Sequence, residues 1–184
     1  GVLFNTEKTV LLTYPTGKAE TNYTIPDSVT SIGEEAFSWC KSLTSITIPD
    51  SVTSIGSSAF YDCSSLTSIT MGDSVASIGH TAFANCTSLT SITIPDSVTS
   101  IGSVAFMSCR SLTSITMGDS VTSIGFNAFA RCTSLIAVIF LGDAPKVGSG
   151  ALEGSSSTIY RKPEAKGWGD TWGGRPVRLI SEKP

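Results

Sequence analysis

The chain has 184 residues, which is enough for one domain with a substantial hydrophobic core. Only 15% of its residues are charged, against roughly 25% in an average domain, and the net charge is −3. A nucleic-acid-binding surface needs a clustered basic face, so we expect no nucleic-acid partner. The chain contains no run of about 18 apolar residues, so we expect no membrane insertion, and no signal peptide is visible at Gly1.

The first 24 residues carry no repeat. Apolar residues 2–4 and 9–12 flank the polar segment 5–8, a pattern typical of a β-hairpin. A turn around Pro15 and Gly17 leads into Ile25. We therefore expect residues 1–24 to form a hairpin-like N-terminal cap.

From residue 25 the sequence repeats with a strict 23-residue period. The unit is L-T-S-I-T-[IM]-[PG]-D-S-V-T-S-I-G-x-x-A-F-x-x-C-x-S, and it covers residues 25–152 as five full coils and a degenerate sixth. Such periodicity predicts a solenoid, in which each coil is stable only when stacked on its neighbours. The period fixes the columns Gly33, Gly56, Gly79, Gly102, Gly125 and Gly148; Phe37, Phe60, Phe83, Phe106 and Phe129; and Cys40, Cys63, Cys86, Cys109 and Cys132.

The pattern inside one unit predicts its local structure. Ile46 and Ile48 alternate with polar residues, as in a short half-buried strand. Gly56 suits a turn, and Phe60 followed by Cys63 suits a single helical or 3₁₀ turn that fills the coil centre. The predicted fold is therefore an α/β-type repeat solenoid with short parallel strands.

A second period of 46 residues, twice the first, is also present. Ile48-Pro49 becomes Met71-Gly72, returns as Ile94-Pro95, and becomes Met117-Gly118. Residues 48–93 and 94–139 are thus copies of a 46-residue pair, which indicates a duplication. Identity between coils therefore does not by itself indicate selection for a ligand.

The sixth coil departs from the period, because Leu152, Ser155 and Thr158 replace Phe, Cys and Leu. Exposed strand edges at the end of a solenoid must be covered. We expect residues 153–184 to form an irregular C-terminal cap. Trp168 and Trp172 in this tail supply either the bulk of the cap or a surface that stacks on sugars.

The string I-P-D-S-V-T-S-I-G-x-x-A-F-x-x-C-x-S-L resembles the BspA-like leucine-rich repeats, also called the Treponema pallidum type. Residues 2–18 and 159–177 are similar to the usual start and end of bacterial members. The resemblance implies a curved right-handed solenoid and a secreted or surface-attached bacterial protein. It also implies adhesion to host matrix proteins or cells for some members. It carries over no catalytic motif and no cofactor.

Three surfaces are candidates for binding. The first is the outward strand face, uniform in hydroxyl groups, which suits a repetitive glycan or simply keeps the sheet soluble. The second is the variable segment between each Gly and Cys, where larger side chains either form an apolar patch or pack locally. The third is the tryptophan tail. The residues are Ser45, Thr47, Ser68, Thr70, Ser91, Thr93, Ser114 and Thr116; Trp39, Tyr61, Met107 and Phe126; and Trp168 and Trp172.

Other chemical groups favour structural roles. The cysteines lack metal spacing, and their common register predicts buried free thiols rather than disulfides or a redox centre. The repeated aspartates suit backbone capping in turns, with calcium binding as the alternative: Asp27, Asp50, Asp73, Asp96 and Asp119. His80, the only histidine, occupies a variable slot and is expected at the surface.

We therefore expect no enzyme and no cofactor. The leading hypothesis is a secreted or cell-surface interaction module that binds a host matrix or cell-surface protein. A carbohydrate-binding module and a purely structural spacer are the alternatives.

Overall fold

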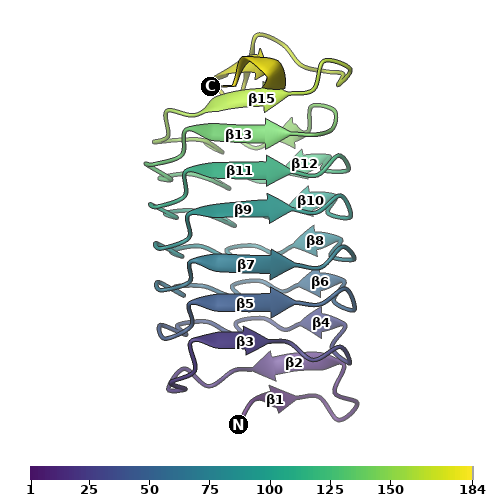
Figure 1. Ribbon diagram of the computed structural model, residues 1–184, viewed down its shortest axis with the longest axis vertical. Coiled ribbons are helices and arrows are strands. Elements are labelled where there is room, and N and C mark those ends of the chain that lie inside the picture. The colour runs from purple at the N-terminus through teal and green to yellow at the C-terminus, as the bar shows by residue number, and fades with distance from the viewer. Residues whose placement is uncertain (184) are drawn as a thin grey trace.

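The computed structural model describes residues 1–183, and in Figure 1 they form a stack of coils. Each coil contributes a long strand of three or four residues and a short strand of two. The long strands are β3 (Asn22–Thr24), β5 (Ser45–Ile48), β7 (Ser68–Met71), β9 (Ser91–Ile94), β11 (Ser114–Met117), β13 (Ala137–Phe140) and β15 (Thr158–Arg161). The short strands are β4 (Ser31–Ile32), β6 (Ser54–Ile55), β8 (Ser77–Ile78), β10 (Ser100–Ile101), β12 (Ser123–Ile124) and β14 (Lys146–Val147).

Neighbouring coils pair in parallel and in register, so that Ser45 lies opposite Ser68 and Ser91 opposite Ser114. Side chains of a strand alternate between its two faces. Ile46 and Ile48 are buried accordingly, while Thr47 between them is exposed. The predicted 23-residue solenoid with half-buried parallel strands is therefore confirmed.

The predicted helical turn between each Gly and Cys is wrong. Residues 34–39 form successive turns in which Glu35 and Trp39 have φ of 56° and 63°, and the same two positions repeat in the following coils. A left-handed residue interrupts a right-handed helix. The amide of Phe37 donates to the carbonyl of Ala59 in the next coil, at 2.7 Å, instead of closing a helical turn. The fold is thus a β-solenoid rather than the expected α/β repeat.

The core is built around a column of stacked phenylalanine rings. Neighbouring rings from Phe37 to Phe129 lie 4.8–5.3 Å apart between centroids and within 14° of parallel. Tyr14 extends the column at its N-terminal end, with its ring 5.1 Å from that of Phe37. The column continues from coil to coil and gives the solenoid a continuous apolar centre.

The five cysteines are free and buried, as their register predicts. Each thiol also donates a hydrogen bond to a carbonyl of the preceding coil: the Cys63 Sγ lies 3.0 Å from the Phe37 oxygen, and the Cys109 Sγ 3.2 Å from that of Phe83. Burial raises the pKa of Cys40 to about 11 and raises the pKa values of Cys63 and Cys86 further. The thiols of Cys40, Cys63 and Cys86 are therefore protonated donors that tie neighbouring coils together.

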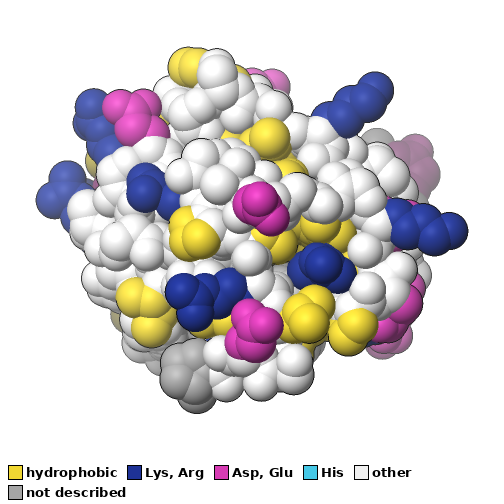
Figure 2. Space-filling view, turned by 90° about the horizontal axis from the view of Figure 1, so that it is seen from above, with side chains coloured by type: hydrophobic (Ala, Val, Ile, Leu, Met, Phe, Trp, Pro, Cys, Tyr) yellow, Lys and Arg dark blue, Asp and Glu magenta, His cyan; other side chains and the backbone are white. Residues whose placement is uncertain are grey.

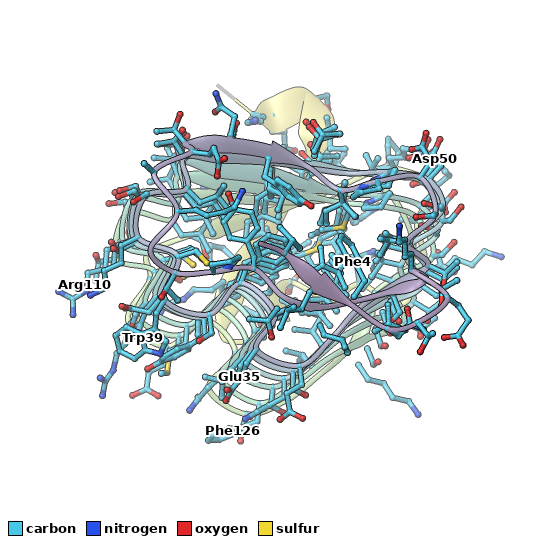
Figure 3. The ribbon with its side chains drawn as sticks, turned by 90° about the horizontal axis from the view of Figure 1, so that it is seen from below. Phe4, Glu35, Trp39, Asp50, Arg110 and Phe126 are labelled. Atoms are coloured by element: carbon cyan, nitrogen blue, oxygen red, sulfur yellow. The ribbon has the colours of Figure 1, made fainter. Side chains whose placement is uncertain are left out.

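The predicted N-terminal hairpin is present. β1 (Leu3–Phe4) pairs antiparallel with β2 (Val10–Thr13), and β2 pairs in parallel with β4. The Asn5 Oδ1 closes the turn by accepting the amides of Thr9 and Val10, each at 2.8 Å. The hairpin thereby continues the sheet of short strands and places Phe4 across the end of the coil outline (Figure 3).

The C-terminal segment folds onto the last coils. β16 (Thr171–Trp172) pairs antiparallel with β17 (Arg175–Leu179), which pairs in parallel with β15; the 3₁₀ helix η1 (Ile180–Glu182) follows. This end shows separate hydrophobic, basic and acidic side chains rather than one apolar surface (Figure 2). Within residues 1–183, no helix is long and apolar enough to cross a bilayer.

Candidate functional site: the long-strand face and its open seam

The long-strand face is the surface formed by the outward side chains of the long strands. The predicted hydroxyl residues lie together on it, and Thr47, Ser68, Thr70, Ser91 and Thr93 are exposed, whereas Ser45, Ser114 and Thr116 are half-buried. None of these eight side chains carries a charge. The face therefore offers hydroxyl donors and acceptors to a partner.

This face is divided between β7 and β9. The long strands form two sheets, β3-β5-β7 and β16-β17-β15-β13-β11-β9, whereas β8 and β10 of the same two coils remain paired. Figure 1 shows the wider separation of β7 and β9. We call this open junction between Ser68–Met71 and Ser91–Ile94 the seam.

Hydrogen bonds confirm the division. The amide and hydroxyl of Thr67 both donate to the Thr44 carbonyl, at 2.8 and 3.0 Å, and those of Thr113 donate to the Thr90 carbonyl, at 2.9 and 3.0 Å. In the part of the chain that the structure describes, no such bond joins Thr90 to Thr67. The seam therefore leaves backbone donors and acceptors of two strand edges unpaired.

A cavity of about 400 Å³ lies along the seam. Its walls come from both strands and the residues beside them, so hydroxyl and apolar side chains line it together, with Asp73 as its one charged residue. Ile69 and Met71 are only half-buried here, although their counterparts Ile92 and Ile94 are buried. The lining residues are Thr67, Ser68, Ile69, Thr70, Met71, Asp73, Thr90, Ser91, Ile92, Thr93 and Pro95.

The opening coincides with a proline, Pro95. The amides of Gly118 and Leu141, at the equivalent position, donate to the preceding coil at 2.8 and 3.1 Å, but proline has no N–H. The closed junctions also leave no room for a side chain at this position. In the next coil, a Cβ on the equivalent Gly118 would lie 2.5 Å from the Pro95 oxygen. At this closed spacing a proline ring would collide with the coil before it. Pro49 occupies the equivalent position in an earlier coil. There β3 and β5 remain paired, but their pairing ends at Thr24–Thr47.

A second candidate lies on the variable turns. The rings of Trp39 and Tyr61 meet edge to face with centroids 5.5 Å apart, and Trp39 is 51% exposed. The Lys41 Nζ lies 5.1 Å from the Trp39 ring centroid and 3.5 Å from an Asp62 oxygen. The Asn85 Nδ2 donates to the Tyr61 hydroxyl at 3.3 Å. We call these five residues the aromatic cluster.

The structure does not join the other predicted apolar residues to this cluster. Met107 is half-buried and occupies the slot of Tyr61 two coils further along the chain. Phe126 is 51% exposed and belongs to the slot of Glu34. Trp39 and Phe126 project from the same side of the coil outline in Figure 3, but at different heights of the stack.

The tryptophans of the tail pack inward. Trp172 is buried, its Nε1 donates to the Pro145 carbonyl at 3.0 Å, and its ring centroid lies 5.0 Å from that of Phe140. Trp168 is half-buried, with its centroid also 5.0 Å from that of Phe140. This packing supplies bulk to the end of the solenoid and leaves Trp172 no exposed ring face for a sugar.

Two of the five predicted aspartates cap backbone amides, and they do so between coils rather than within their own turns. The Asp50 Oδ1 accepts the amide of Asp73, and the Asp96 Oδ1 accepts that of Asp119, both at 2.9 Å. Both bonds lie inside a 46-residue pair. Among residues 1–183, no three His, Cys, Asp or Glu side chains come together as metal ligands would. His80 is exposed, as predicted.

The family of the chain follows from its repeats. The profile of the BspA type leucine-rich repeat region matches residues 16–136 and 53–164, with six copies. The chain belongs to this family. None of the curated proteins matches this BspA-type chain.

Solved structures of bacterial leucine-rich-repeat proteins are similar to this BspA-type chain. A leucine-rich cell surface protein of Faecalibacterium prausnitzii is 37% identical over 73% of the chain and 35% of its own length, with a TM-score of 0.71. A leucine-rich-repeat protein of Eubacterium ventriosum is 30% identical over 94% and 52%, with a TM-score of 0.74. The leucine-rich-repeat protein of T. pallidum is 25% identical over 84% and 85%, with a TM-score of 0.65. The chain thus spans about a third of the first protein and half of the second.

The seam is the part of the candidate site that the sequence pattern does not predict. The sequence predicts a uniform strand face here, because the side chains repeat without interruption. A signal was nevertheless present: Met71-Gly72 followed by Ile94-Pro95 is the one junction in the BspA-type repeats where a proline coil follows a glycine coil. The 46-residue period marks the same boundary.

Proposed function

We propose that the chain is a non-catalytic interaction module of a secreted or cell-surface bacterial protein, and that it binds a host matrix or cell-surface protein. The observation that carries this proposal is the long-strand face. Repeats of this bacterial surface type suggest protein interaction, and the relative from F. prausnitzii is described as a cell surface protein.

The long-strand face suits a protein partner because it is mostly exposed, uncharged and held in register by pairing between neighbouring long strands on each side of the seam. A prearranged surface loses little conformational entropy on binding. Hydroxyl groups at fixed spacing provide hydrogen bonds rather than ion pairs. We therefore expect the affinity for the partner to change little with ionic strength, in contrast to binding through a charged surface.

A panel of purified matrix and cell-surface proteins, measured by surface plasmon resonance, tests the proposal. We expect at least one protein to bind, and Thr47→Arg/Thr93→Arg to weaken that binding by more than about tenfold, because it places bulk and charge on the long-strand face. The matched control is Thr53→Arg/Thr99→Arg, which changes two exposed threonines on the short-strand side. A panel without any binding partner, or equal losses in both variants, would contradict the proposal. The first result would favour a structural spacer.

Carbohydrate binding is a second candidate, favoured by the aromatic cluster. A half-exposed tryptophan beside polar Lys41, Asp62 and Asn85 has the parts that a sugar needs, namely an apolar ring face and lateral hydrogen-bonding groups. Glycoproteins in the panel separate the two functions. Binding that disappears on enzymatic deglycosylation and in Trp39→Ala, but persists in the equally exposed Phe126→Ala, would assign the partner to this cluster.

A further inference from the structure

We propose that the seam binds an extended segment of a partner protein, which enters between β7 and β9 as an additional β-strand. This inference rests on the proposed protein-binding function and assigns its site. It uses the open backbone edges of the long-strand face rather than the hydroxyl side chains alone.

The chemistry of the opening identifies the occupant. Two strand edges with unpaired N–H and C=O groups face each other, and the groups at the closed junctions on either side are all engaged by parallel neighbours. An extended polypeptide presents alternating donors and acceptors with the matching repeat, as other β-strand additions do. A glycan lacks that alternation. Asp73 is the one charged residue of the lining, so the cavity presents no cluster of charge that would select a highly charged ligand.

The walls also restrict the side chains of the occupant. An added strand places alternate side chains inward, beside the half-buried Ile69 and Met71, which a small aliphatic residue would cover. The other side chains face outward beside Thr70 and Thr93, where hydroxyl groups are accommodated. The segment we expect therefore alternates aliphatic and polar residues, like the long strands of this chain.

The opposite side of the two coils can act as the hinge for entry. The Gly102 amide still donates to the Ile78 carbonyl at 2.8 Å, and the rings of Phe83 and Phe106 remain stacked 5.2 Å apart. Some Cα atoms of β7 and β9 lie within 8 Å of one another, whereas strands that flank an inserted strand lie about 10 Å apart. The seam must therefore widen by a few ångströms about this paired side.

A disulfide across the seam tests the proposal. A disulfide spans Cα atoms up to about 6.8 Å apart, so a bond across the seam holds β7 and β9 well short of the roughly 10 Å that an inserted strand needs. Thr70→Cys/Thr93→Cys locks the seam when oxidised, and the control Ser54→Cys/Ser77→Cys places the same bond across the paired short strands β6 and β8. The native cysteines are buried, so the introduced thiols react first.

The probe is a fluorescein-labelled peptide with the sequence of residues 64–72, followed by fluorescence anisotropy. We expect saturable binding to the wild type, a loss of at least about tenfold in affinity for the oxidised Thr70→Cys/Thr93→Cys variant, and recovery after reduction. The oxidised control variant binds like the wild type. The same peptide carrying Ile69→Pro should bind at least about tenfold more weakly, because proline removes a backbone donor.

Equal binding to the locked and reduced forms, equal binding of the proline peptide, or no binding to the wild type would overturn the proposal. The recovery on reduction shows that the locked variant is folded. A protein from the panel that binds the locked variant as well as the wild type would leave the proposed function standing and overturn the seam as its site. Peptide binding at the seam without any protein partner in the panel would support the seam as a binding site and contradict the proposed function.

Discussion

Phe83→Ala is expected to lower the free energy of unfolding by about 5 kcal/mol, the upper end of the range for removing a buried phenylalanine. Phe83 has no exposed surface, and its ring stacks on Phe60 at 5.0 Å and on Phe106 at 5.2 Å. The change removes both stacking contacts, each contributing about 0.5–1.5 kcal/mol beyond burial. The surrounding coils cannot collapse into the gap, because their backbones are held by hydrogen bonds between coils. Urea denaturation measures the loss.

Phe126→Ala is the matched control, because Phe126 is 51% exposed, and we expect it to cost less than about 1 kcal/mol. Tryptophan fluorescence reports both ends of the solenoid, through Trp39 near the start and Trp168 and Trp172 near the end. Phe83→Ala lowers the coupling between them, so the two ends can unfold separately. A cost below about 1 kcal/mol for Phe83→Ala would show that the phenylalanine column does not hold the stack together.

Gly102→Ala is expected to destabilise the protein by about 2–3 kcal/mol. A Cβ at this position would lie 2.6 Å from the Gly79 carbonyl carbon and 2.7 Å from the His80 nitrogen. Both atoms belong to the backbone of the preceding coil and cannot rotate away. The entropy that alanine removes from the unfolded chain offsets only about 0.4–1 kcal/mol of this cost.

Gly17→Ala separates the two contributions, since no atom lies within 4 Å of a Cβ at Gly17. We expect this control to leave stability unchanged or to raise it by up to about 1 kcal/mol, through the unfolded chain alone. If thermal denaturation gives the two variants the same midpoint, the glycine column does not set the distance between coils.

Features that depend on one repeat unit could be predicted from the sequence. The alternation of Ile46 and Ile48 with hydroxyl residues places strands correctly, because it expresses which side of a strand meets the core. The shared register of the cysteines likewise places all five inside. Identical units have to stack in register, so one correct unit extends to the whole repeat.

Features that depend on contacts between coils could not be predicted in this way. The A-F-x-x-C segment has the apolar spacing of a helical turn, yet Phe37 donates its amide to the next coil, and Trp39 adopts a left-handed conformation. The Cys63 thiol bonds the carbonyl of Phe37 for the same reason. A periodicity within one chain segment contains no information about such partners.

The seam lies at the boundary between the two 46-residue copies, where the pairing of the long strands is interrupted. Within each 46-residue pair, an aspartate accepts the amide of the next coil, as Asp50 does for Asp73. Between the pairs, Pro95 has no amide to donate and the long strands separate. Duplication of a pair therefore places a weak junction in the middle of an otherwise continuous solenoid.

Amide hydrogen exchange measured residue by residue by NMR tests this central feature most directly. Thr67, Thr90 and Thr113 are identical residues at the same position of three successive coils, but only Thr67 and Thr113 donate to the coil before them. We predict that the Thr90 amide exchanges at least about tenfold faster than the other two, because local opening costs little where no bond is present. Equal protection of all three threonine amides would show a continuous sheet and would contradict the seam.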